Sequence, residues 1–258
     1  SAASDVYKRQ VLITAVMSFG SIRSTNKLQL DNIQVTTRIA SQSISSNLHL
    51  LTERIYNIST DAELTDDSLS KKDKAAYLQD FEQKIEFVWL SVYDADGKKL
   101  YGDKTAPDSI ADTKYYSQLA ETANTVIGEP HYDQAVLQLC VGAPLKANDE
   151  VCGYVIGSYK YDLLNDVLSM LILGDTGSAC IINEKGTIIA DQDEKNIADQ
   201  VSIYDKNSSS KNKEIYDRIL SYQTGSVTMK LHGVSHYVGY TPIPGTNWVL
   251  LVLSLIHI

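Results

Sequence analysis

The sequence predicts an α+β fold in which a long N-terminal helix precedes two tandem antiparallel-sheet modules. Two observations lead to this prediction: apolar residues at helical spacing near the N-terminus, and one hairpin pattern that occurs twice. The pattern is an apolar run, a polar turn with glycine, a second apolar run and an aspartate, at residues 92–103 and 181–191. Glycine in the turns, at Gly97 and Gly186, permits the positive φ that such hairpins need. A hairpin cannot bury its own face, so each copy is expected to open a larger sheet, although two unrelated hairpins would show the same pattern.

The long helix is predicted from residue 28 to residue 59, a stretch without Gly or Pro. Its apolar residues recur in steps of three, four or seven, which mark one face of an amphipathic helix. They are Ile33, Ala40, Ile44, Leu48, Leu51, Ile55 and Ile58. Thirty helical residues span about 45 Å. We expect residues 28–74 to form a stalk helix followed by a polar loop, and the stalk to pair with a second copy of the chain.

The two ends of the chain are expected to lie outside this fold. Residues 11–20 are apolar and uncharged but too short for a full membrane span, which needs about 20 residues. We interpret residues 1–27 as adapter-like sequence followed by the C-terminal part of a transmembrane helix; a buried helix or a signal-peptide core is the alternative. Residues 254–258 also resemble translated adapter sequence, so the natural protein is expected to continue at both ends.

The first module is predicted to occupy residues 75–161, with a hairpin, a capped helix and a three-stranded antiparallel segment. Its expected elements are helix 75–85, strands 87–93 and 98–101, helix 113–122 (capped by Asp112 or Thr113), and strands 126–128, 136–143 and 151–161. A connector helix is expected over residues 162–175. The second module, residues 176–253, repeats the arrangement with strands 178–182 and 187–190, helix 215–222, and strands 226–231, 235–242 and 248–253.

Composition argues against several function classes. The formal charge is 23 − 32 = −9, and no extended Lys/Arg cluster exists, so nucleic acid is not an expected partner. Cys140, Cys152 and Cys180 lack metal-ligand spacing, and we interpret them as small buried residues. The triplet at residues 175–177 matches the aspartic-protease motif but occurs once, whereas that chemistry needs two carboxylates. We therefore expect no catalytic residues, no metal and no cofactor, and do not expect an enzyme.

Several short motifs, in this order, resemble the double Cache (dCache) family of sensor domains. They are Glu129-Pro130, Val141–Leu145, Gly153–Gly157, Leu163-Leu164, Thr176-Gly177 with Ile181–Gly186, and Gly245–Leu250. The resemblance covers residues 28–252. It implies two PAS-like modules after the long helix, flanking transmembrane helices, a cytoplasmic output domain and an extracytoplasmic position at the bacterial cell membrane. The implied function is small-molecule sensing in a chemoreceptor, histidine kinase or cyclase, without catalysis in this domain.

The resemblance also implies where a ligand binds, namely in the membrane-distal module, residues 75–161. One subset of the family recognises amino acids through Arg-x-Trp-Tyr, Tyr-x-Asp and a final Asp. These motifs fall here on residues 113–116, on residues 131–133 and on Tyr159, and only Tyr116 and Asp133 match. An ordinary amino-acid sensor is therefore not expected. Lys114 is one position from the missing Arg, but a neighbouring residue on a helix faces elsewhere.

What remains at these positions is an aromatic set with one acid. The candidate ligand-binding residues are Tyr101, Thr113, Tyr115, Tyr116, His131, Asp133 and Tyr159. Ring faces and hydroxyl donors suit a planar or weakly charged ligand, such as a nucleobase or an aromatic amine. The alternative is that these tyrosines pack the sheet, in which case the chain is a ligand-free structural or protein-interaction ectodomain. The proximal module, residues 176–253, lacks a comparable polar cluster and is expected to relay changes.

Overall fold

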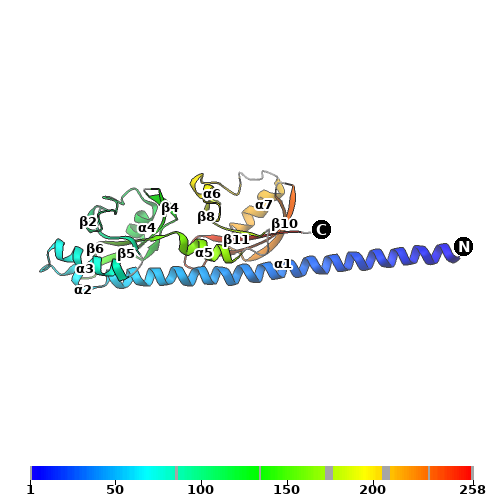
Figure 1. Ribbon diagram of the computed structural model, residues 1–258, viewed down its shortest axis with the longest axis horizontal. Coiled ribbons are helices and arrows are strands. Elements are labelled where there is room, and N and C mark those ends of the chain that lie inside the picture. Colours follow the sequence, from blue (N-terminus) through cyan, green and yellow to red (C-terminus); the bar gives the residue numbers. More distant parts are fainter. Residues whose placement is uncertain are drawn as a thin grey trace.

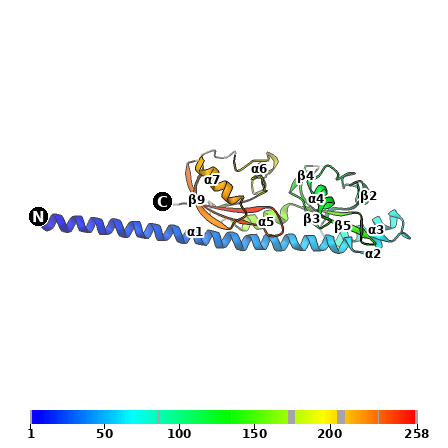
Figure 2. The same ribbon diagram turned by 180° about the vertical axis from the view of Figure 1, so that it is seen from behind.

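In the computed structural model, one long helix runs along two sheet modules that lie side by side (Figure 1). The structure describes residues 2–84, 87–133, 135–171, 177–204, 210–231 and 233–256. Helix α1 (Ala2–Ser59) packs against strands of both modules, and the view from behind shows the same arrangement (Figure 2). The predicted fold class, a long N-terminal helix followed by two antiparallel-sheet modules, is confirmed.

Helix α1 buries the face that its sequence predicted. All seven apolar residues of the predicted stripe are at most 5% exposed, among them Ile44 and Ile55 at 0%. The helix is continuous from Ala2 to Ser59, so residues 2–27 and the predicted stalk form one helix. None of the helices within the described residues combines the length and hydropathy needed to cross a bilayer. The truncated membrane segment at residues 11–20 stays a prediction.

The two sheets have the same strand order. The distal sheet runs β2-β1-β6-β5-β3 with β4 paired to β5, and the proximal sheet runs β8-β7-β11-β10-β9. The distal elements are α2 (Ala62–Thr65), α3 (Lys71–Lys84), β1 (Phe87–Asp94), β2 (Lys99–Gly102), α4 (Lys114–Thr122), β3 (Val126–Ile127), β4 (His131–Asp133), β5 (Val136–Ala147) and β6 (Glu150–Lys160). The connector is α5 (Asp162–Met170), and the last four residues of its predicted range lie outside the described residues. The proximal elements are β7 (Ser178–Ile182), β8 (Ile188–Asp191), α6 (Glu194–Ala198), α7 (Ser210–Ile219), β9 (Gly225–Leu231), β10 (Val234–Pro242) and β11 (Val249–Leu255).

The two hairpins are alike down to their turn chemistry. Asp94 Oδ1 accepts hydrogen bonds from the backbone N–H groups two and four residues later, at 3.0 and 2.8 Å. Asn183 Oδ1 accepts the equivalent pair at 3.0 and 3.0 Å. Gly97 and Gly186 follow with φ of 78° and 77°, the left-handed region that glycine adopts without strain. The repeat recognised in the sequence is therefore a repeat of structure.

Three sequence expectations are wrong. Ser254 and Leu255 were expected outside the fold, but they belong to β11. Their backbone continues the ladder with β10, where they pair with Tyr237 and His236. Cys152 is exposed rather than buried, whereas Cys140 and Cys180 are buried as predicted. The stretch after α1 is not a simple loop, since α2 forms there and α3 begins at Lys71 rather than at residue 75.

Each sheet has one face on α1 and one face covered by its own helix. In β6, Val155 and Tyr159 belong to the core that includes α1, whereas Tyr154 and Ile156 belong to the core beneath α4. This alternation follows from the two-residue period of a strand. The α4 side of the distal sheet is thus the face on which a site formed by α4 and β4 can lie.

Candidate functional site

Helix α4 begins at the edge of the distal module, and its cap fixes that start. Thr113 Oγ1 accepts a hydrogen bond from Tyr116 N at 3.2 Å and donates one to Ile110 O at 2.7 Å. A threonine at this position supplies a partner for a backbone N–H group that the first turn of a helix leaves unpaired. The cap thereby sets the direction in which Lys114 and Tyr115 leave the helix.

A cleft of about 340 Å³ opens at this point, between the two modules. Its distal wall is made by the start of α4, Gln118 and the segment Ile127–His131. Its proximal wall is made by Gln200, Asn247 and Trp248. The volume lies at the lower end of the range for small-molecule sites, about 300–1,000 Å³. Residues of both modules therefore face the same space.

The aromatic part of the distal wall consists of Tyr115 and His131. Their ring centroids are 6.3 Å apart with an interplanar angle of 31°. His131 is half-buried, with Nδ1 at 3.1 Å from Glu129 O and Nε2 at 3.9 Å from Cys140 Sγ. Burial raises the pKa of the Cys140 thiol to about 12, so this sulfur stays protonated at neutral pH. Burial likewise raises the pKa of Tyr115, which remains a neutral hydroxyl.

Behind this wall, the α4 face of the sheet holds a buried polar group. Gln138, 3% exposed, accepts a hydrogen bond from Trp89 Nε1 at 3.1 Å and another from the Ser158 hydroxyl. The Gln138 amide in turn donates to Asp133 O at 3.5 Å. Buried polar side chains are normally hydrogen-bonded, as these are. Through the bond from Gln138 to Asp133 O, the cluster anchors the end of β4.

The structure divides the seven sequence-predicted residues. Thr113, Tyr115 and His131 line the cleft. Asp133 ends β4 beside them but does not line it, and Tyr116 points to the other side of α4. There the Tyr116 hydroxyl donates to Ala95 O at 2.9 Å.

Tyr101 and Tyr159 are on the opposite face of the sheet. Tyr101 OH donates to Leu64 O at 3.3 Å, and the Tyr159 ring lies 4.7 Å from that of Phe87 in the core that includes α1. Both are thereby separated from the cleft by the sheet. We correct the candidate set accordingly: these two tyrosines pack the sheet, as the alternative interpretation of the sequence held.

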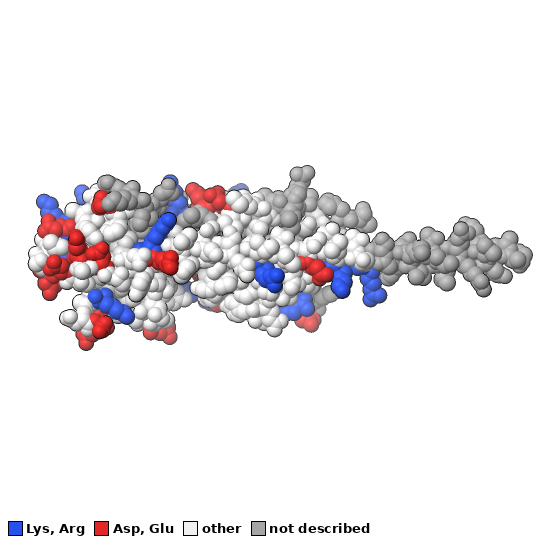
Figure 3. Space-filling model, turned by 90° about the horizontal axis from the view of Figure 1, so that it is seen from below, with Lys and Arg blue, Asp and Glu red and all other residues white. Residues whose placement is uncertain are grey.

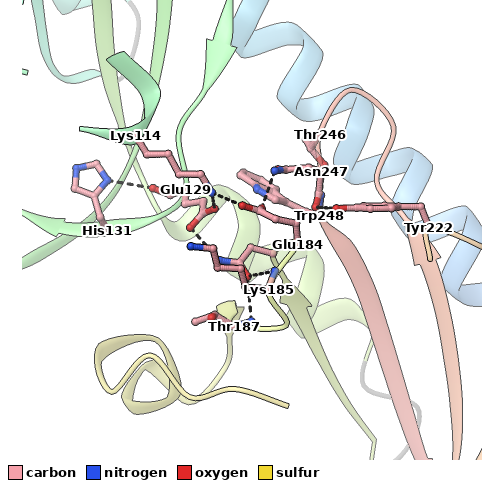
Figure 4. Close-up of polar contacts among 11 residues, drawn as sticks. Lys114, Glu129, His131, Glu184, Lys185, Thr187, Tyr222, Thr246, Asn247 and Trp248 are labelled. Atoms are coloured by element: carbon pink, nitrogen blue, oxygen red, sulfur yellow. Dashed lines mark hydrogen bonds and ion pairs between the residues drawn. The ribbon is translucent and has the colours of Figure 1, made fainter. Parts of the chain in front are cut away.

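Lys114 was expected to face away from the site but lines the cleft next to Tyr115. The expectation is wrong because positions 114, 115 and 118 lie within about 100° of one another around α4, so that all three side chains line the cleft. Its Nζ is 2.7 Å from Glu129 Oε1 and 2.6 Å from Glu184 Oε1, across the module boundary (Figure 4). Glu129 belonged to a recognised motif, but nothing in the sequence paired Lys114 with a residue 70 positions away.

The contact between Lys114 and Glu184 favours the ionised form of both side chains. Desolvation lowers the pKa of Lys114, but its hydrogen bonds to Glu129 and Glu184 outweigh this and raise the pKa above its ordinary value. For Glu184, desolvation raises the pKa, and the hydrogen bond and charge of Lys114 outweigh it and lower that pKa. The formal charge of the three side chains, one lysine and two glutamates, is −1. Within the described ranges, no group of three or more His, Cys, Asp or Glu side chains is placed to hold a metal ion.

Comparison with known proteins identifies relatives of this architecture. The family model for the Cache domain (dCache_1) matches residues 21–254. The ligand-binding domain of the Pseudomonas aeruginosa amino-acid chemoreceptor PctC, solved with GABA, is 17% identical with a TM-score of 0.69, covering 88% of this chain and 99% of that one. The ligand-binding domain of the Pseudomonas fluorescens chemoreceptor CtaA, solved with L-isoleucine, is 19% identical with a TM-score of 0.68, covering 90% and 95%.

The extracellular domain of a protein described as a histidine kinase is also similar, at 14% identity and a TM-score of 0.69, covering 87% of this chain and 93% of that one. At these identities the likeness to solved structures shows the fold. A search of curated protein sequences finds no match.

Proposed function

Because the chain belongs to the Cache domain family, we propose that it is the extracytoplasmic small-molecule sensing domain of a bacterial transmembrane receptor. The observation that carries the proposal is the cleft of about 340 Å³ whose walls come from both modules. A ligand held there touches the distal helix α4 and the proximal residues Asn247 and Trp248 together, so binding bears directly on how the modules meet. Such a contact is what population-shift signalling requires.

The chemistry of the cleft favours a planar molecule with a positive or neutral polar group. Tyr115 and His131 supply ring faces for stacking, and Gln118 and Asn247 supply amide donors and acceptors. The cation on the wall, Lys114, already contacts two carboxylates, so it is a poor partner for a further carboxylate. An aromatic amine or a nucleobase-like compound fits these side chains better than an ordinary amino acid does.

Helix α1 is the element proposed to relay the change. It packs on β5 of the distal module and on β10 of the proximal module, so the same helix contacts both modules. Glycines permit this packing: a side chain at Gly239 would meet Thr37 and the backbone of Ile33, and one at Gly157 would meet Ile55. A small rearrangement at the cleft is thereby transmitted along α1 and β11, which we place nearest the membrane.

The outer face of α1 is proposed to pair with a second copy of the chain. Leu28, Val35, Ile39 and Leu50 are 46–60% exposed, and their spacings of 7, 4 and 11 place them on one stripe. The view of this side from below shows few charges along its middle, while acidic side chains gather at the distal end (Figure 3). Sedimentation of the wild type and of Ile39→Lys tests the pairing: a dimer that the substitution dissociates supports it, and a monomeric wild type contradicts it.

Ligand binding is tested by a thermal-shift screen against aromatic amines, nucleobases, amino acids and short carboxylates. A specific ligand stabilises the fold by RT ln(1 + [L]/Kd), about 2.7 kcal/mol at a hundredfold excess over Kd. The variant His131→Gln should lose the shift. His236→Gln is its matched control, because His236 Nδ1 also lies near the carbonyl two residues before it, at 3.0 Å, but in β10.

Two results would contradict the proposal. A screen without any specific stabiliser, confirmed by calorimetry, would favour a ligand-free structural or protein-interaction ectodomain. A hit that survives His131→Gln and is lost in His236→Gln would move the site to the proximal module.

A further inference from the structure

Besides the apolar core that α1 shares with both modules, a network of charged and amide side chains joins the two modules at the cleft. Lys114 Nζ joins Glu129 of its own module to Glu184 of the proximal turn, at 2.7 and 2.6 Å. The second oxygen of Glu129 accepts from Asn183 Nδ2 at 3.2 Å, and the second oxygen of Glu184 accepts from Asn247 Nδ2 at 2.7 Å. The network thus crosses the boundary twice, and all four carboxylate oxygens have partners.

The proximal side of this network is held rigidly. Asn183 is buried, and its Oδ1 is occupied by the two backbone N–H groups of the hairpin turn. Its amide nitrogen is therefore directed to Glu129 by the geometry of the turn. Asn247 is held through its main chain, because its backbone carbonyl oxygen accepts a hydrogen bond from Tyr222 OH at 3.1 Å (Figure 4).

The distal hairpin shows what is special about Asn183. The equivalent residue there is Asp94, which accepts the same two backbone hydrogen bonds but has no N–H to donate. Both residues satisfy the turn. Asparagine at position 183 supplies, in addition, a donor for Glu129, where an aspartate would place a second negative charge.

The network also belongs to the wall of the cleft. Lys114, Glu129 and Asn247 line it together with Tyr115 and His131. A change in the distance between Lys114 and Glu184 therefore changes the width of the space that a ligand enters. The two carboxylates are partly exposed, at 26% and 30%, so water can replace the contacts when they open.

We propose that Lys114 is a positioning residue that holds the two modules together and keeps the cleft narrow, and that its release from Glu184 opens the cleft. The network is hereafter the Lys114 latch, formed by Lys114, Glu129, Asn183, Glu184 and Asn247. The inference rests on the proposed function only in assigning the cleft to a ligand; the latch itself is testable in the ligand-free protein. Part-exposed ion pairs contribute little free energy each, which suits a contact that must open and close.

The test measures access to the cleft and the arrangement of the modules in the same variants. Diethyl pyrocarbonate modifies accessible imidazoles, and mass spectrometry compares the rate at His131 in the cleft with the rate at His236 in β10. Spin labels on Cys152, the exposed native cysteine, and on Ala198→Cys at the end of α6 report the distance between the modules. Neither readout needs a known ligand.

Lys114→Met should raise the rate at His131 relative to His236 about twofold to fivefold, the range expected for release of a part-exposed ion pair. Asn183→Asp should do the same, since it keeps the turn but places a carboxylate opposite Glu129. In both variants the label distances should shift or broaden. Asp94→Asn, the reverse exchange in the distal turn, and Lys99→Met, which removes an ion pair of 3.1 Å within the distal module, are the controls and should change neither readout.

The proposal is overturned if Lys114→Met and Asn183→Asp leave both readouts at wild-type values, or if the controls change them equally. Slower modification of His131 would overturn it as well, because the latch would then hold the cleft open. Failure of the ligand screen together with a positive latch result would contradict the sensing role and leave the latch standing.

Discussion

The distal and proximal modules share one strand order and one turn geometry but differ on the face turned away from α1. The distal face carries Trp89, Gln138 and Ser158 in a buried hydrogen-bonded group, with His131 at its edge. The proximal face under α7 is mainly aliphatic, with Ile182, Ile219, Met229, Val238 and Leu251 in one core. The same topology therefore supports a polar site in one copy and a packed core in the other, and the side chains decide which.

The largest expected effect concerns the contact of each module with α1. Gly239→Ala should cost about 3 kcal/mol and Gly157→Ala about 1 kcal/mol, the two ends of the usual range for overpacking. At Gly239 the added carbon meets the backbone of Ile33, which cannot move aside, whereas at Gly157 it meets side-chain ends of Ile55 and Phe87. Denaturant unfolding measures both. Equal costs would show that the helix accommodates the two modules alike.

The second prediction compares the stability cost of a substitution on the polar distal face with one on the aliphatic proximal face. Gln138→Leu should destabilise the chain by about 1–3 kcal/mol, because it leaves the buried Trp89 N–H and Ser158 hydroxyl without their acceptor. Met229→Leu in the proximal core should cost less than about 1.5 kcal/mol, as a swap that conserves volume. A chemical-denaturation series compares them. A neutral Gln138→Leu would mean that the distal face does not depend on its polar group.

The smallest effect is the pH dependence of the Lys114 latch. The pKa of Glu184 is lowered in the folded chain, so its contribution to stability is present above the unfolded pKa of about 4.5 and is lost as the pH falls through the folded value. The stability difference between wild type and Glu184→Gln should be under about 1 kcal/mol at pH 7, since the pair is part-exposed. The difference should shrink as the pH falls below the unfolded pKa and be lost once the pH is below the folded pKa. A difference that does not change with pH on the acid side would show that the ionised carboxylate is not its source.

The sequence predicted the parts of this structure that local pattern determines. Helical spacing identified the buried stripe of α1, and a glycine after a short polar turn identified both hairpins. It did not predict β4, because a strand of three residues exists only by pairing with β5. It also could not decide which face Tyr159 takes, since a shift of one residue along a strand reverses the face.

The candidate site was predicted only where it lies near one helix cap. Thr113, Tyr115 and His131 reach the cleft, but its proximal wall comes from residues 200, 247 and 248, which packing alone brings close. The partner of Lys114 is likewise set by how the modules meet and not by any spacing in the chain. Contacts of this kind need the three-dimensional arrangement.

The most direct test of whether the distal module carries the ligand site is a calorimetric titration. The best ligand from the screen is titrated into wild type, His131→Gln and Met229→Leu. If the ligand binds in the cleft, the wild type should show one binding site, His131→Gln should lose binding and Met229→Leu should bind with unchanged affinity. Loss of binding in Met229→Leu, with binding kept in His131→Gln, would contradict it and assign the ligand to the proximal module.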